Sequence, residues 1–246
     1  MPRTPNALGG TSPLDPPAAP RARRGVIALT AALLGAGLAV TACGTLGAAA
    51  VSNSQRISST DLSNEVGNLN AAYQADKKQI QLQFPASQMP QQVLSWLVKF
   101  QVGDQLAAQE GITVTPADVA NELNAIRKQI KQSGESATLT QVAVANGLPP
   151  DQLNALGRYE VIQGKALDRL DGGKLPSSTS AQQALESKFD HSQCLAAKSL
   201  NIQINPQYGT LNYSDLSVVL APTTLSNPQS SAPTPAASKP VTTPPC

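Results

Sequence analysis

Aromatic side chains are scarce in this chain, which has one Trp, four Tyr and three Phe among its 246 residues. An aromatic-lined pocket for a small molecule therefore has little to be built from, and so has a platform on which nucleic-acid bases stack. The apolar residues that remain to form a core are mainly Leu, Val, Ile and Ala. Such a composition favours a helical domain with a modest core.

Residues that bind metals or perform acid–base chemistry are equally few. The chain has a single histidine, His191, and three widely spaced cysteines, whereas the usual metal sites need clustered ligands. A Ser-His-Asp hydrolase would depend on His191, and a solvated surface histidine explains that residue fully. The pair Gly172-Gly173 lacks the strand and the Lys-Ser/Thr context of a phosphate loop, so we interpret it as a linker. We predict no cofactor and no metal.

A strong charge of one sign is also missing. The formal net charge is +2, and residues 1–42 hold four of the 18 basic residues but only one of the 16 acidic residues. Without that segment the net charge falls to about −1, so the slight basicity belongs to the N-terminus. Nothing in the charge pattern favours nucleic-acid binding.

The N-terminal segment has a clear order of residue types. A basic cluster at residues 21–24 precedes an apolar stretch at residues 26–40, and small residues then lead to Cys43. The stretch is shorter than the ~20 residues that a membrane-spanning helix needs. The order resembles a bacterial lipoprotein signal peptide with its lipobox. The resemblance implies cleavage between Ala42 and Cys43, acylation of the Cys43 sulfur, and anchoring at the extracytoplasmic face of the cell membrane. An ordinary secretory signal and a short buried helix are the alternatives.

Composition divides the chain into segments. From Ala221 onward there are seven prolines, one charge and no aromatic residue, which is typical of disorder. We predict a disordered, basic segment (1–24), a signal h-region with lipobox (25–42), a flexible spacer (43–50), one folded domain (51–212) and a disordered Pro/Ser/Thr-rich tail (213–246).

Hydrophobic spacing and helix-capping residues predict six helices within the folded domain. Ser58 or Ser59 caps the first, and Thr115 with Pro116 begins the third. The predicted helices span residues 60–83, 90–109, 116–132, 139–146, 150–170 and 179–199. The last helix carries an apolar stripe that we expect to face the core, made of Ala181, Ala184, Leu185, Phe189, Leu195 and Ala196.

Strand patterns occur at both ends of the predicted domain. Residues 49–58 predict a hairpin that turns at Asn53 and Ser54, and residues 200–204 alternate like a strand. The segment Asn205-Pro206-Gln207-Tyr208-Gly209 follows, in which Pro206 stops pairing and Gly209 permits a turn. We expect the late strand to pair with the hairpin. The predicted fold is mainly α, with a small β-hairpin joined by a C-terminal strand and disordered tails at both ends.

Four stretches in this order carry a family resemblance. They are the hairpin with its helix cap (51–62), residues 106–119, residues 146–149 with the helix that follows, and residues 205–209. Together they resemble the N-terminal chaperone module of the SurA family of envelope foldases, which is related in fold to the substrate-binding part of trigger factor. The resemblance covers residues 48–212.

The resemblance implies a membrane-anchored, ATP-independent holdase that binds unfolded or newly exported polypeptides. Its client-binding surface is expected on the second and third helices, although a small domain needs most of its apolar residues inside. The candidate contacts are Leu94, Trp96, Leu97, Phe100, Val119, Leu123 and Ile126. The alternative is a scaffold lipoprotein with one dedicated envelope partner. The oligomeric state stays open.

One departure from the family bears on catalysis. Many SurA-like foldases carry a parvulin prolyl isomerase domain between the fifth and last helices, where this chain has only residues 171–178. With a single histidine as well, the chain is not expected to be an enzyme.

Cys194 and Cys246 are separate from the lipobox. Cys194 lies off the predicted apolar stripe and is expected to face outward. An exported compartment permits disulfides. A Cys194–Cys246 bridge that folds the tail back onto the domain, two free thiols, and an intermolecular bond are the three alternatives.

Overall fold

The computed structural model describes residues 47–53, 55–134, 136–173, 176–220 and 246. The chain divides into residues 1–40 and residues 41–246, and every described element belongs to the second unit. The predicted lipobox, with Ala42 and Cys43, lies outside the described residues, as does the apolar stretch before it. The elements are β1 (Ala48–Val51), β2 (Arg56–Ser58), α1 (Ser59–Ala75), α2 (Met89–Glu110), α3 (Pro116–Gln132), α4 (Leu139–Ala145), α5 (Leu153–Leu170), α6 (Thr179–Leu200), β3 (Gln203–Ile204), β4 (Thr210–Asn212) and β5 (Ser217–Val219).

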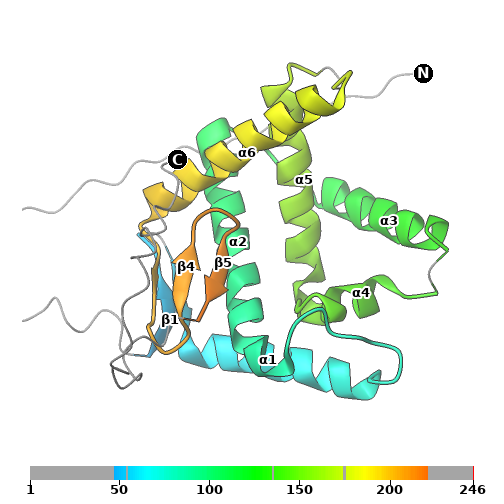
Figure 1. Ribbon diagram of the computed structural model, residues 1–246, viewed down its shortest axis with the longest axis vertical. Helices are drawn as coiled ribbons and strands as arrows, with labels where there is room; N and C mark the ends of the chain where they lie inside the picture. The colour runs from blue at the N-terminus through cyan, green and yellow to red at the C-terminus, as the bar shows by residue number, and fades with distance from the viewer. Residues whose placement is uncertain (1–46, 54, 135, 174–175, 221–245) are drawn as a thin grey trace, which may run out of the picture. The chain divides into compact units, whose positions relative to one another are not determined.

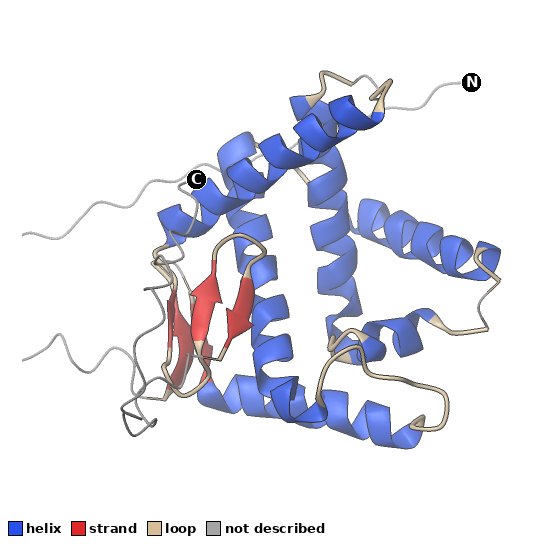
Figure 2. Ribbon diagram, viewed as in Figure 1, coloured by secondary structure: helices blue, strands red, loops and turns tan. Residues whose placement is uncertain are grey.

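Helices make up most of the described chain, and the strands form two small groups (Figure 2). In the first group β1 lies between β2 and β3 and is antiparallel to both. The Asn205 side chain adds a hydrogen bond from Nδ2 to the Ala48 carbonyl oxygen (2.9 Å). The predicted hairpin and its pairing with a late strand are therefore confirmed, and so is the mainly α fold class.

Capping residues set the helix starts where the sequence places them. The Ser58 hydroxyl accepts a hydrogen bond from the Asp61 backbone amide (2.9 Å) and begins α1. Thr115 begins α3 with a reciprocal capping box to Asp118, and Pro116 occupies the first turn. Five of the six predicted helices have ends within about three residues of those observed.

The first helix is the exception, because α1 ends at Ala75 rather than at Gln83. Apolar residues beyond it alternate with polar ones, as Ile80, Leu82 and Phe84, and this period of two is typical of extended chain. Ile80 is buried, Leu82 and Phe84 are half-buried against the core, and the Gln83 amide donates to the Ala145 carbonyl oxygen (2.8 Å). Packing of this extended segment onto α4 replaces the predicted last turns of the helix.

The main core lies around α2, which contacts α1, α5, α6 and β5. Figure 1 shows α2 and α5 side by side, with α6 across them and α3 on the far side of α5 from α2. The core takes Val93, Leu94, Val98, Val102 and Leu106 from α2. No helix in the described ranges is long and apolar enough to cross a membrane.

The buried face of α6 differs from the predicted stripe. Phe189, Ala196, Ala197, Leu200 and Cys194 are buried there, whereas Leu195 is 47% exposed and Ala181 and Ala184 are exposed. The stripe prediction is wrong at these positions, because the buried residues lie in the C-terminal part of α6, and its packing against α2 selects a neighbouring face of the helix.

The folded domain also extends beyond the predicted boundary at residue 212. β5 pairs with β4 in antiparallel register, with Leu211 opposite Val218. Leu216 and Val218 belong to the main core, and the Val218 amide donates to the buried Ser95 hydroxyl of α2 (2.8 Å). Residues 213–220 are therefore part of the fold. Residues 221–245, the rest of the predicted tail, lie outside the described residues.

Candidate functional site

Some half-buried apolar side chains lie apart from the main core and could contact a partner. They belong neither to that core nor to the side chains packed against it, and they come mostly from α2, α3 and α5. Members of this set are Trp96, Phe100, Val119, Ile126, Ile130, Leu153, Leu156 and Tyr159. Their placement makes the α2–α5–α3 region the candidate site for binding a polypeptide.

One concavity in this region is a groove between α3 and the first half of α5, with a volume of about 650 Å³. It exists because the two helices approach closely at Gly157. A Cβ atom at that position would lie 2.8 Å from Leu123 Cγ and 3.0 Å from Val119 Cγ1. The lining is Pro116, Val119, Ala120, Leu123, Asn124, Arg127, Asn154, Ala155 and Arg158.

A second cavity of about 500 Å³ continues along α3 beyond Arg127, which lines both. Ile130 and Lys131 of α3, Leu139 of α4 and Leu153 of α5 supply much of its wall. The two cavities together form a surface that we call the α3 groove. It offers aliphatic side chains and helical alanines rather than aromatic walls.

The seven predicted client contacts fall into different environments. Val119 and Leu123 line the α3 groove, although Leu123 is only 5% exposed, and Ile126 is half-buried on the same helix. Leu97 is half-buried against the main core. Leu94 is fully buried within the core (0% exposed), so its assignment as a client contact is wrong. The apolar spacing of α2 is the same for core and surface positions, which is why the sequence did not separate them.

Trp96 and Phe100 form an aromatic cluster with Tyr159 of α5. The ring centres of Trp96 and Phe100 are 5.9 Å apart, and those of Phe100 and Tyr159 are 6.2 Å apart. Trp96 Nε1 donates to the Asn146 carbonyl oxygen (3.0 Å), and the Tyr159 hydroxyl accepts from Gln193 of α6 (2.8 Å). These bonds give the cluster a structural role in joining α2 to its neighbours.

Several titratable groups around the site have shifted pKa values. Burial raises the pKa of Tyr159 and of Glu160, and the nearby Glu122 charge raises the latter further. Burial also lowers the pKa of Lys99, whose ammonium nitrogen lies 5.3 Å from the Trp96 ring centre. Burial thus works against a charge on each of these three groups.

Ion pairs hold the helices that border the α3 groove. Arg158 Nε lies 2.7 Å from Asp104 Oδ1 of α2, and Lys165 Nζ lies 2.8 Å from Asp118 Oδ2 of α3. The hydrogen bond from Lys165, with the bonds to Thr115, lowers the pKa of Asp118 from 3.8 to about 2. The link between α3 and α5 is therefore fully charged above about pH 4, and it weakens only as the pH falls toward 2.

Sequence reasoning missed Gly157 and Arg127, which shape the α3 groove. Gly157 occurs inside a helix, where glycine is unfavourable, and this was the available indication of a close helix contact. Arg127 gave no such indication, because an exposed helical arginine is usually only a solvated charge. Among the described residues, no group of His, Cys, Asp and Glu is arranged to hold a metal ion.

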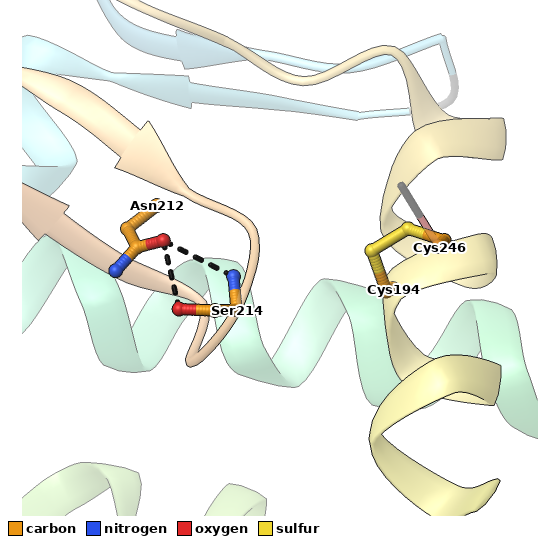
Figure 3. The surroundings of a disulfide bond; sticks show 4 residues. All are labelled: Cys194, Asn212, Ser214 and Cys246. Carbon is orange, nitrogen blue, oxygen red and sulfur yellow. Dashed lines mark hydrogen bonds between the residues drawn. A yellow bond between two sulfur atoms is a disulfide. The ribbon is translucent and has the colours of Figure 1, made fainter. Parts of the chain in front are cut away.

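In the structure a disulfide joins Cys194 of α6 to Cys246, with a Cα–Cα distance of 5.7 Å (Figure 3). Cys194 is 9% exposed, which corrects the expectation that it faces outward. The beginning of the β4–β5 turn is fixed by Asn212 Oδ1, which accepts from the Ser214 amide and hydroxyl. The disulfide ties residue 246 to α6 of the folded domain across a sequence separation of 52.

This disulfide can be tested by thiol labelling of purified residues 44–246, which contain no other cysteine. In denaturant without reductant we expect no labelling, and with reductant we expect both cysteines to react. A non-reducing gel distinguishes the intramolecular bond, which leaves a monomer, from an intermolecular one. Labelling of both cysteines without reductant, or a disulfide-linked dimer, contradicts the bond.

The chain is similar to a known protein family. A family model described as the SurA-like N-terminal domain matches residues 23–167, which extend through the α3 groove into α5. No curated protein and no solved structure matches the chain. The family match ends before α6 and before the strands β3–β5. Because it covers more than half of the 246 residues, the chain belongs to the SurA-like N-terminal domain family.

Proposed function

We propose that this protein is a membrane-anchored, extracytoplasmic, ATP-independent holdase that binds unfolded or newly exported polypeptides in the α3 groove. The observation that carries the proposal is the pair of adjoining cavities along α3, lined by Val119, Leu123, Ile130 and Leu153. Membership of the SurA-like N-terminal domain family supports it, because that family relates the chain to chaperones.

The physical character of the groove suits transient binding of many clients. Its floor is aliphatic, and its rim consists of small residues such as Ala120 and Ala155 and polar ones such as Asn124 and Asn154. A short extended segment buries little area in such a groove, and aliphatic surfaces discriminate weakly between side chains. Binding is therefore expected to be weak and broad, as a holdase requires.

The membrane anchor rests on the lipobox-like sequence that ends at Cys43. Two or three acyl chains, at ~0.8 kcal/mol per buried methylene, hold a protein stably in a membrane, whereas one chain holds it marginally. Anchoring would keep the groove beside the site where exported chains emerge. The alternative remains a scaffold lipoprotein that binds one dedicated envelope partner and protects no other protein.

The test is an aggregation assay with two unrelated denatured proteins and purified residues 44–246, with prolyl isomerisation measured in parallel. We expect aggregation of both proteins to be suppressed without isomerase activity. Replacing Ala120 and Ala155 with glutamine places longer side chains in the groove without adding charge. This double variant should need about fivefold more protein for the same protection, which corresponds to ~1 kcal/mol of lost affinity.

A matched control replaces Ala71 and Ala125 with glutamine, because both are exposed helical alanines outside the lining of the α3 groove. It should protect as well as the original sequence, and thermal melts should show that both double variants are folded. Protection of neither client by the original sequence contradicts the holdase and favours the scaffold. Equal protection by both double variants moves client binding away from the α3 groove.

A further inference from the structure

The described charged residues that line the α3 groove are all basic. They are Arg127, Lys131 and Arg158, and no Asp or Glu among the described residues lines either cavity. Arg158 is already paired with Asp104 of α2 (2.7 Å). Arg127 instead donates from Nη1 to the uncharged Asn124 side chain (2.8 Å), and no ion pair joins Arg127 or Lys131 to a described carboxylate. Two cations at the groove therefore retain their capacity to bind an anion.

This charge is local rather than a property of the whole chain. A cavity of about 550 Å³ near the C-terminal end of α5 has Asp168, Asp171 and Glu186 among its described lining residues. Without residues 1–42 the chain is close to neutral overall.

The spacing of the two cations defines which anion fits. Arg127 and Lys131 are four residues apart on α3, so they lie on one face, separated by about 6 Å along the helix axis. In an extended polypeptide, residues two apart point to the same side and are separated by about 6.6 Å. Two carboxylates in an Asp/Glu-x-Asp/Glu arrangement therefore match the two cations.

We propose that the α3 groove selects extended client segments in which two Asp or Glu residues are separated by one residue. The inference rests on the proposed function, because it names the class of client that the same groove binds best. Apolar contacts supply affinity for every client, and Arg127 with Lys131 adds the preference for acidic ones.

The test uses fluorescein-labelled, capped peptides of sequence GSLEVELSG, GSLQVQLSG and GSLKVKLSG, titrated with residues 44–246 and followed by fluorescence anisotropy. At low ionic strength the acidic peptide should bind about fivefold more tightly than the glutamine peptide, since two exposed ion pairs give a gain of this size. The lysine peptide should bind more weakly than both. Added salt should reduce these differences, because the pairs are solvent-exposed.

The double variant Arg127→Gln, Lys131→Gln should bind the acidic and glutamine peptides equally. Lys128→Gln is the matched control, because Lys128 is exposed on α3 and lines neither cavity; it should keep the preference. Thermal melts check that each variant is folded.

The possible outcomes separate this inference from the proposed function. Equal binding of all three peptides, or an acidic preference that survives in the double variant, overturns the charge selection and leaves the holdase intact. Failure to bind any peptide, together with failure to suppress aggregation, overturns both.

Discussion

Replacing Gly209 with alanine is expected to destabilise the fold by about 3 kcal/mol or more. Gly209 has φ = +125°, a backbone conformation that residues with a Cβ rarely adopt. A Cβ at this position would overlap the Val219 carbonyl oxygen of β5 and lie 2.8 Å from its carbonyl carbon. Backbone strain of about 1–3 kcal/mol therefore adds to a steric overlap of similar cost, and neither is relieved by rotating a side chain.

Urea denaturation of residues 44–246, followed by circular dichroism, measures this loss. Gly67→Ala is the control, because Gly67 lies inside α1 and a Cβ there would meet nothing within 4 Å. That variant should be more stable by about 0.5–1 kcal/mol, since alanine favours a helix over glycine. Equal stability of Gly209→Ala and the original sequence contradicts the close approach of residue 209 to β5.

Gly209 also affects how the late strands attach to the helices. Leu216 and Val218, which follow in the β4–β5 hairpin, fill part of the main core beside α2. If alanine forces β5 away, these two side chains become exposed. We therefore expect the Gly209→Ala variant to bind hydrophobic dyes at urea concentrations where the original sequence does not.

Replacing Leu94 with alanine is expected to cost about 3 kcal/mol of stability while leaving client binding unchanged. Leu94 is 0% exposed within the main core, and removing a fully buried leucine side chain loses its transfer free energy and leaves a cavity. A residue in this position cannot touch a client in the folded protein. The expected effect is therefore on folding, in contrast to the role that its place on the apolar face of α2 predicted.

The measurement pairs urea denaturation with the aggregation assay, run at a temperature where the variant remains folded. Leu195→Ala is the matched control, because Leu195 is also a helical leucine but is 47% exposed on α6. Its substitution should change stability by no more than about 0.5 kcal/mol. Reduced protection by folded Leu94→Ala, without a loss of stability, contradicts its place in the core.

Local chemistry explains most of what was predictable in the fold. Ser58 and Thr115 begin helices because their side chains satisfy free backbone amides at the first turn. The left-handed Gly111 ends α2 where the sequence places its end. Both of these features depend on residues that are close together in the sequence. The late strand at Gln203 pairs with β1 as its alternating pattern and its position after the last helix predicted.

Features that depend on distant contacts were predicted less well. The α6 stripe was assigned to Leu195, whereas packing against α2 selected the face with Cys194 and Ala197. Residues 213–220 were assigned to the disordered tail, yet β5 joins the fold through Ser95 of α2. Helical periodicity fixes which residues share a face but not which of two neighbouring faces a partner will cover.

The candidate site divides in the same way. The sequence by itself determined that this is a mainly helical, aromatic-poor domain with a lipobox-like N-terminus, and it placed Val119 and Leu123 on one face of a single helix. Only the tertiary structure decided that this face opens as a groove against α5, because the absence of a side chain at Gly157 lets two helices approach. It also decided that Arg127 and Lys131 border that groove while Leu94 does not, because the exposure of a side chain depends on what packs over it.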